Sequence, residues 1–222
     1  MKGALCQTRS PKLSPRLLAL LGLVPWESRV ADVGCDHALL LIRALISGRV
    51  SFGVGVDASE QALRGARDSR ARWGLEDRLV LRHGRGLASL TQNEVDVVVM
   101  AGMGACNVLE SLWVAEHLPS RLVLQPNRDL MDLRRALADL GWRIDKECLP
   151  GSGRRFHPTL SLVPGEQPSM SELELFLGPE LMKQPGPELL AWADRAILPF
   201  RARREPWVQD YEDWRLSALR HG

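Results

Sequence analysis

A glycine and two acidic residues near the start of the chain have the spacing of a nucleotide-binding turn. Asp32 lies in an apolar run that ends at Gly34, Asp36 follows in the turn, and Asp57 ends the next apolar run. A glycine lets the backbone approach a ligand where a side chain would block it. A carboxylate about 20 residues further on can accept hydrogen bonds from ribose hydroxyls. The spacing therefore predicts a site for a ligand that contains a ribose.

The chemistry of the turn narrows the choice of ligand. A dinucleotide site takes the form G-x-G-x-x-G, whose later glycines let a pyrophosphate reach the helix N-terminus. Here Asp36 and His37 stand where later glycines would stand, and an acid repels a pyrophosphate. The same acid suits a ligand with a cationic or amine end. The turn thus favours S-adenosylmethionine over NAD, with an α/β domain that binds no ligand as a further alternative.

Two later apolar runs also end in residues suited to ligand binding. The run 95–100 leads into Ala101-Gly102-Met103-Gly104, and the run 122–124 leads into Gln125-Pro126-Asn127. In an open α/β sheet the ligand crevice lies beyond the carboxyl ends of the strands. We expect these glycines to admit a ring or a sulfonium, and the two amides to face a base edge. Tight strand–helix packing and a turn cap around the proline are the respective alternatives.

The elements that position these residues alternate between strand and helix patterns. Such alternation predicts an α/β fold, with a mostly parallel sheet and helices on both faces. Two strand patterns without a helix between them, 142–149 and 158–163, predict an antiparallel hairpin at one edge. After them, prolines and glycines separate helical pieces, and helices at 188–197 and 201–220 would form a hairpin. The predicted organisation is a ligand-binding domain at 1–165 and a helical appendage at 166–222.

Composition indicates a globular protein with a sizeable core. The 222 residues are 45% hydrophobic with a formal net charge of +2, so no global basic field points to nucleic acid. The four cysteines lack disulfide or metal-ligand spacing, and no apolar run reaches the ~18 residues of a membrane span. We expect a cytoplasmic monomer without a metal or membrane attachment.

Two basic segments have open interpretations. Residues 1–26 carry Arg16 and other basic residues on a predicted helix begun by Ser14 and Pro15. A solvated face is favoured there over contact with phosphates. The same choice holds for a cluster in the tail, which consists of Arg195, Arg201, Arg203 and Arg204.

Three motifs in order resemble a known family. ADVGCDH after the first strand, AGMG after the fourth and LQPN after the fifth are similar to those of the TrmK-type bacterial tRNA methyltransferases. The resemblance covers about residues 13–163. It implies a Rossmann-like class I methyltransferase that uses S-adenosylmethionine to methylate N1 of the adenine at tRNA position 22. It also implies a C-terminal helical domain, for which the tail here is short.

The resemblance further implies roles for single residues. Asp36 becomes the candidate catalytic residue, because a carboxylate beside the adenine stabilises the positive charge that N1 methylation places on the ring. A helix N-cap is its competing role, and packing is the more common role for His37. The candidate cofactor residues are Asp32, Gly34, Asp57, Gly84, Ala101 and Gly102, and the candidate substrate residues are His37, Met103, Gln125 and Asn127.

One departure from the family pattern keeps an alternative function open. Where the family has an acid in a G-D-G turn after the third strand, this chain has Arg85 between two glycines. The alternative is a catalytically weakened or silent relative that binds RNA. A methyltransferase for exocyclic amines of nucleic acid is disfavoured, because AGMG replaces the N/D-P-P-Y/F motif of those enzymes.

Overall fold

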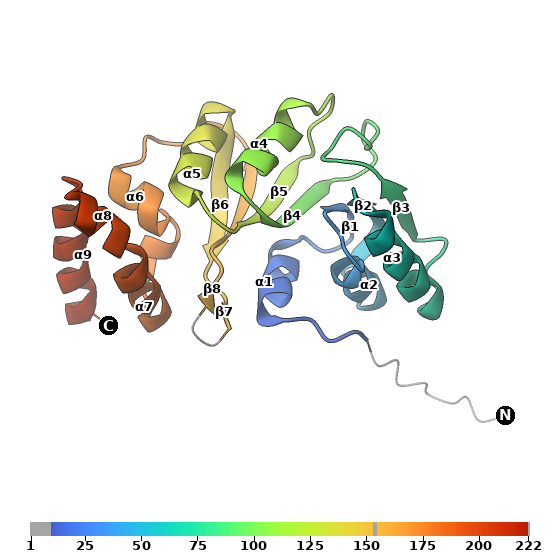
Figure 1. Cartoon of the computed structure of the whole chain (residues 1–222), viewed down its shortest axis with the longest axis horizontal. Helices are drawn as coiled ribbons and strands as arrows, with labels where there is room; N and C mark the ends of the chain where they lie inside the picture. Colours follow the sequence, from blue (N-terminus) through green and yellow to red (C-terminus); the bar gives the residue numbers. More distant parts are fainter. Residues whose placement is uncertain (1–9, 153–154, 222) are drawn as a thin grey trace.

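A single seven-stranded sheet organises the chain in the computed structural model, which describes residues 10–152 and 155–221 (Figure 1). The strand order is β3-β2-β1-β4-β5-β9-β6. Strands β1 to β5 pair in parallel, and β9 runs antiparallel to both of its neighbours. The predicted α/β fold with a mostly parallel sheet is confirmed. The strands are β1 (Ser28–Val33), β2 (Val50–Asp57), β3 (Leu79–His83), β4 (Val97–Met103), β5 (Arg121–Pro126), β6 (Trp142–Cys148) and β9 (Thr159–Pro164), beside a small hairpin of β7 (Gly151–Ser152) and β8 (Arg155–Phe156).

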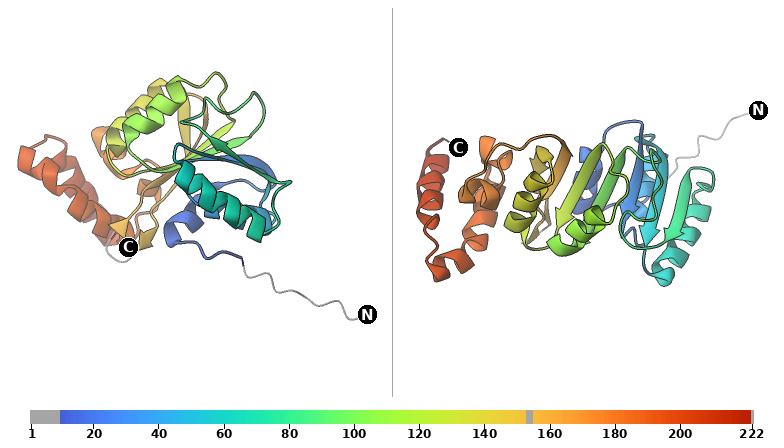
Figure 2. Two further views of the ribbon diagram at one scale, coloured as in Figure 1. Left: turned by 45° about the vertical axis from the view of Figure 1, so that its right-hand side comes forward. Right: turned by 90° about the horizontal axis from the view of Figure 1, so that it is seen from above.

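Helices cover both faces of the sheet, as the views in Figure 2 show. One face carries α1 (Pro15–Leu23), α2 (Leu39–Ile46) and α3 (Glu60–Arg72), and the other carries α4 (Ala105–Trp113) and α5 (Leu130–Asp139). Successive strand residues alternate between the two cores: Val30 packs with the first set of helices and Ala31 with the second. Both faces of the strands are therefore apolar, as expected for parallel strands covered by helices.

At the antiparallel edge, the order of the strands in the sheet differs from their order in the chain. The last strand, β9, lies between β5 and β6, so β6 forms the edge. The residues of β9 explain this position, because Leu160 and Leu162 on alternate positions are fully buried, as is Ser161 between them. The edge strand instead carries charged residues such as Arg143 and Lys146, which suit a strand with one solvated side.

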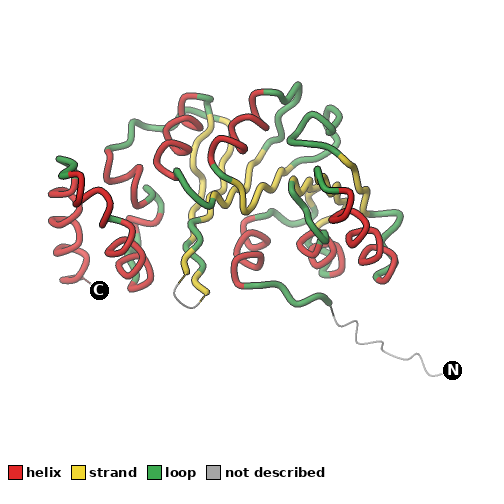
Figure 3. Tube along the Cα trace, in the orientation of Figure 1, coloured by secondary structure: helices red, strands yellow, loops and turns green. Residues whose placement is uncertain are grey.

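The tail is helical in its described elements (Figure 3). The structure divides the helix expected over 201–220 into two, because the chain turns at Arg204 (φ 57°), two residues before Pro206. A proline has no backbone N–H and disfavours helical geometry in the residue before it. None of the helices in the described part of the chain has the length and apolar character needed to cross a membrane. The tail elements are α6 (Glu172–Leu177), η1 (Leu181–Lys183), α7 (Pro187–Ala196), α8 (Leu198–Arg203) and α9 (Val208–His221).

A buried ion pair joins the tail to the sheet. Arg134 of α5 and Glu147 of β6 approach to 2.6 Å, with side-chain exposures of 0% and 1%. Arg134 also donates to the carbonyls of Leu175 and Phe176 in α6, at 2.6 and 3.1 Å. Glu147 accepts from the backbone N–H of Glu180 at 3.0 Å. The tail therefore docks through hydrogen bonds that only this ordered arrangement satisfies, while the division at residue 165 stays a prediction.

Candidate active site

The carboxyl ends of β1, β2, β3 and β4 meet at a cavity of about 460 Å³, a volume typical of small-molecule sites. Three of the predicted cofactor residues, Gly34, Asp57 and Gly84, line it. The ends of β1, β2 and β4 thus converge as expected, whereas the end of β5 lines a second cavity. The full lining comprises Val33, Gly34, Asp57, Ala58, Gly84, Arg85, Gly86 and Met103 from the strand ends, and Asn107, Glu110, Ser111 and Val114 from α4.

The turn after β1 has an unusual backbone. Gly34, Asp36 and Ala38 all adopt left-handed conformations, with φ of 80°, 49° and 54°. The left-handed φ of Gly34 favours glycine, and an added Cβ would also displace the end of the Met103 side chain, which lies 2.7 Å from that position. Ala38, not Asp36, occupies the N-cap position of α2. The competing capping role for Asp36 is therefore wrong, and its side chain is 74% exposed at the turn.

Asp57 fixes this turn to the end of β2. Its Oδ2 accepts from the backbone N–H of Asp36 at 2.9 Å, and its Oδ1 accepts from the N–H of Ser59 at 2.8 Å. A carboxylate offers about four lone-pair positions. Two of them remain available at the cavity, which is what a pair of ribose hydroxyls requires.

Asp32 is a buried acid below the turn. The residue is 6% exposed, and its side chain forms no hydrogen bond or ion pair with another described residue. Burial and the charge of Asp57 raise the pKa of Asp32 from 3.8 to about 7, although Arg16 acts in the opposite direction. A buried carboxylate of this kind is stabilised in its charged form by a cation brought close to it.

A second cavity, of about 410 Å³, lies beyond the end of β5. The predicted substrate residues Gln125 and Asn127 line it, together with two aromatic rings, Phe156 and Trp192. Met103, the third predicted substrate residue here, lines the first cavity instead. The lining comprises Gln125, Pro126, Asn127, Arg128 and Leu130 from the β5–α5 segment, Arg155, Phe156, His157 and Pro158 from the segment before β9, and Trp192 from α7.

The tip of β4 separates the two cavities. Asn127 donates from Nδ2 to the carbonyl of Gly102 at 2.6 Å, and from its backbone N–H to the carbonyl of Met103 at 2.8 Å. Gly102 has a left-handed φ of 78° and lies at a bulge in the pairing of β4 with β5. Met103 lines the first cavity and Asn127 lines the second, so the two cavities approach each other at these hydrogen-bonded residues.

The remaining predicted residues line neither cavity, namely Asp32, Asp36, His37, Ala101 and Gly102. Ala101 lies in β4, paired with Gln125. The His37 ring packs over Gly65 of α3, where it leaves no space for an added Cβ. A substrate role for His37 stays a prediction. Within the described residues, no group of three or more His, Cys, Asp or Glu side chains could hold a metal ion.

Several residues of the two cavities escaped the sequence analysis. Asn107, Glu110, Ser111 and Val114 follow the i, i+3, i+4, i+7 spacing of one helix face, so the segment after the fourth strand did carry that signal. Arg16 carried none, because its partner is 109 positions away: its Nη1 donates to Gln125 Oε1 at 2.8 Å. At this residue, the solvated face favoured for the N-terminal helix is wrong.

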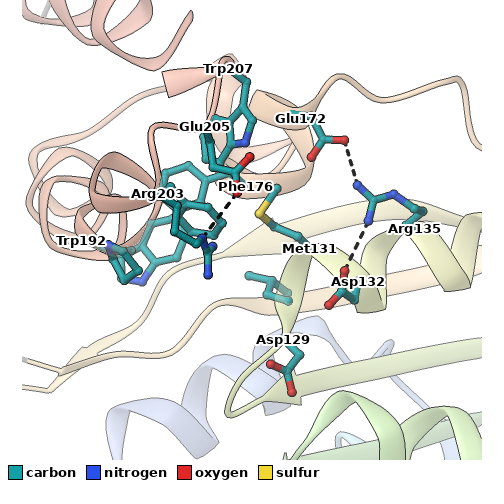
Figure 4. A pocket seen from close by; sticks show the side chains of 14 residues that line it. Asp129, Met131, Asp132, Arg135, Glu172, Phe176, Trp192, Arg203, Glu205 and Trp207 are labelled. Carbon is teal, nitrogen blue, oxygen red and sulfur yellow. Dashed lines mark hydrogen bonds and ion pairs between the residues drawn. The ribbon is translucent and has the colours of Figure 1, made fainter. Parts of the chain in front are cut away.

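A third hollow, of about 550 Å³, lies between α5 and the tail helices (Figure 4). Its charged groups pair with one another, since Arg135 contacts Asp132 and Glu172 at 3.3 and 2.8 Å. Its rings also pack together, with Phe176 and Trp192 stacked at 5.4 Å. No strand end lines it. These contacts connect α5 with the tail helices.

A family model described as a methyltransferase domain matches residues 13–159, which include the turn after β1, the tip of β4 and the end of β5. The chain belongs to this methyltransferase family. The match ends at the first residue of β9 and includes none of the tail helices.

Individual relatives agree with this assignment. The tRNA (adenine(22)-N(1))-methyltransferase of Bacillus subtilis is 29% identical over 126 residues, which cover 55% of this chain and about half of that protein (53%). A Streptococcus pneumoniae protein, solved with S-adenosyl-L-methionine and proposed to be a tRNA (m1A22) methyltransferase, superposes with a TM-score of 0.83 at 26% identity over 94% of this chain and 100% of its own. The B. subtilis TrmK structure shares the fold, with a TM-score of 0.81 at 21% identity over 95% of each chain. The predicted resemblance to TrmK-type proteins is confirmed.

Proposed function

We propose that this methyltransferase transfers a methyl group from S-adenosylmethionine to N1 of an adenine in tRNA, at position 22 as in its relatives. The observation that carries the proposal is the pair of cavities that meet where Met103 and Asn127 are hydrogen-bonded. One of them has the groups for a nucleoside with a cationic end, and the other has the groups for a base.

The first cavity fits S-adenosylmethionine. When bound, this cofactor supplies an electrophilic methyl group on a sulfonium. Asp57 has two free lone-pair positions for the ribose hydroxyls, and the unpartnered Asp32 suits the α-ammonium. Gly34 and Gly102 leave backbone exposed where the reactive end would lie. The cofactor residues Gly84 and Ala101 complete the strand ends around it.

The second cavity fits an adenine in single-stranded RNA. Bases in RNA loops are recognised by stacking on aromatic rings and by hydrogen bonds to their edges. Phe156 and Trp192 supply the rings, and Asn127 supplies an amide. Exposed Arg128 and Arg155 at the rim suit the phosphates on either side. Burial and the charges of Arg16 and Arg155 lower the pKa of His157, so its ring is neutral at pH 7.

Adenine N1 attacks with its own lone pair, so the chain must align the base more than activate it. Methylation leaves positive charge on the ring and acidifies the exocyclic amine. The carboxylate of Asp36 is exposed in the turn after β1, 3.7 Å from the His37 ring, and we propose that it stabilises this charge as it develops.

Asp36→Asn is expected to lower kcat about 100-fold, the magnitude typical of losing one electrostatic partner of a transition state. Asparagine is the appropriate replacement because it tolerates the left-handed backbone that Asp36 adopts, whereas alanine would add strain. The measurement is single-turnover methylation at saturating cofactor and tRNA, with the melting temperature as the folding control. Full turnover in the variant would remove Asp36 from the mechanism.

Asp57→Ala is expected to weaken S-adenosylmethionine binding by on the order of 1–3 kcal/mol, through the lost hydrogen bonds to the ribose. Titration calorimetry without tRNA measures this directly. Asp68→Ala on α3 is a matched control, because it removes an acid from the same region outside the cavity. Equal affinities for the wild type and Asp57→Ala would contradict the assignment of the first cavity.

The proposed activity is tested by incubating the chain with labelled S-adenosylmethionine and tRNA transcripts, followed by nucleoside analysis. N1-methyladenosine is expected from a transcript with adenine at position 22, and none from one with guanine there. Another methylated nucleoside would overturn the substrate. Arg85 lines the cofactor cavity, where the family has an acid. The second candidate function is therefore a silent relative that binds RNA. Binding of tRNA, together with no detectable heat when cofactor is added at millimolar concentration, would favour it.

A further inference from the structure

Arg16 brings a positive charge from the N-terminal helix to the tip of β4 and the end of β5. Its Nη1 lies 3.2 Å from the position that a Cβ on Gly102 would occupy, and it donates to the buried amide of Gln125. That bond uses one of the five N–H donors of a guanidinium. Within residues 10–152 and 155–221, Arg16 forms no ion pair. The remaining donors are therefore available to an anion at the tip of β4.

Asp32 and Arg16 are two unpaired charges of opposite sign at the same strand ends. Each influences the other electrostatically, yet they do not form an ion pair with each other in the described part of the chain. Two such charges held apart at a partly buried site match a ligand that carries both signs. The amino-acid end of S-adenosylmethionine is such a ligand, since it has an α-ammonium and an α-carboxylate.

We infer that Arg16 binds the α-carboxylate of S-adenosylmethionine, while Asp32 binds the α-ammonium. The inference rests on the proposed cofactor and adds a binding residue outside the sheet. Other cations near the site are placed differently. Arg85 follows β3 and lines the first cavity together with Asp57. Arg128 is 78% exposed at the rim of the second cavity. Arg16 is the cation that faces both Asp32 and Gly102.

The position of Arg16 also explains how α1 becomes part of the site. Ser14 caps the helix by accepting from the N–H of Leu17, and Pro15 occupies the first turn. Leu20 and Leu21 anchor the other side of the helix in the core. The first turn is thereby fixed against β5. From Gln125 the hydrogen bonds continue to Asn127 Oδ1 at 3.3 Å and from Asn127 Nδ2 to Gly102, so Arg16 also connects to the tip of β4.

The test compares S-adenosylmethionine with its decarboxylated analogue, which keeps the amine and lacks the carboxylate. Titration calorimetry of Arg16→Gln, without tRNA, is expected to show at least a 10-fold loss of affinity for S-adenosylmethionine. The loss for the decarboxylated analogue is expected to stay below twofold. Arg72→Gln on the exposed end of α3 serves as the matched control and should bind both compounds as the wild type does.

Three results would overturn the inference. Equal losses for both compounds would assign Arg16 a purely structural role. Unchanged affinity for S-adenosylmethionine in Arg16→Gln would show that Arg16 does not bind the cofactor. A defect that appears only when tRNA is added would make Arg16 a phosphate contact. These outcomes differ from a failure of the proposed function, in which the wild type itself would not bind S-adenosylmethionine.

Discussion

Asp32→Asn is expected to weaken S-adenosylmethionine binding by at least about 30-fold while it stabilises the chain without cofactor at pH 8. In the unliganded protein this buried carboxylate has no partner among the described residues, so its charge is unfavourable. In the complex the same charge meets the α-ammonium. Removing one partner of a buried charge pair costs about 2–5 kcal/mol, which corresponds to a loss of affinity of 30-fold to several thousand-fold.

The stabilisation in the absence of cofactor follows from linkage. The pKa of Asp32 rises from 3.8 to about 7 in the folded chain, so between these pH values the folded state holds a proton that the unfolded state has released. The contribution of Asp32 to stability therefore falls as pH rises from about 4 to about 7, by a few kcal/mol. In urea denaturation, the Asn variant is expected to have a higher free energy of unfolding than the wild type at pH 8 but not at pH 5.

Cofactor affinity should have the opposite dependence on pH. Because the α-ammonium binds the ionised carboxylate, affinity is expected to rise by up to 10-fold per pH unit below about pH 7 and then level off. A decline should follow near pH 8, where an α-amino group loses its proton. Calorimetry between pH 5.5 and 9 measures the profile. The same rising limb in Asp32→Asn would contradict this account, because the group that produces it would then be another.

Local signals in the sequence were sufficient for the strand ends and the cavity they form. Apolar runs that end in Gly34 and Asp57 define where strands stop, and parallel strands place those ends on one edge. The position of β9 was also encoded, because its fully buried Leu160 and Leu162 contrast with the charged residues of β6. Polarity along the two strands, more than their order in the chain, decides which one is internal.

Long-range pairs were beyond the reach of local patterns. Arg16 and Gln125 are 109 positions apart, and each alone resembles an ordinary helix or strand residue. Arg134 occupies a helix position that its residue type would place in solvent, yet its side chain is fully buried. In both cases the partner residue lies on another element, and hydrophobic periodicity does not specify which elements pack against each other. The residues that sequence analysis missed are therefore mainly charged groups whose partners only the tertiary fold supplies.

Glu147→Ala is expected to destabilise the chain by about 3–5 kcal/mol, because it leaves the Arg134 guanidinium buried without its counter-charge. The change in midpoint of urea denaturation, followed by tryptophan fluorescence, measures the loss. Glu172→Ala is the matched control: its ion pair with Arg135 is half exposed, and exposed pairs contribute about 1 kcal/mol or less. Similar losses for the two variants would contradict a special role for the buried pair.

The double variant Arg134→Met, Glu147→Leu separates charge from packing. Replacing a buried ion pair by apolar residues of similar volume is often neutral or stabilising. Here, however, Arg134 also donates to the carbonyls of Leu175 and Phe176, and Glu147 accepts from the N–H of Glu180. Those backbone groups would lose their partners, so the double variant is expected to recover only part of the lost stability. Full recovery of stability would mean that the tail docks by apolar contact alone. Partial recovery, with an early separate unfolding transition of the tail, would show that this pair connects residues 166–222 to the methyltransferase domain.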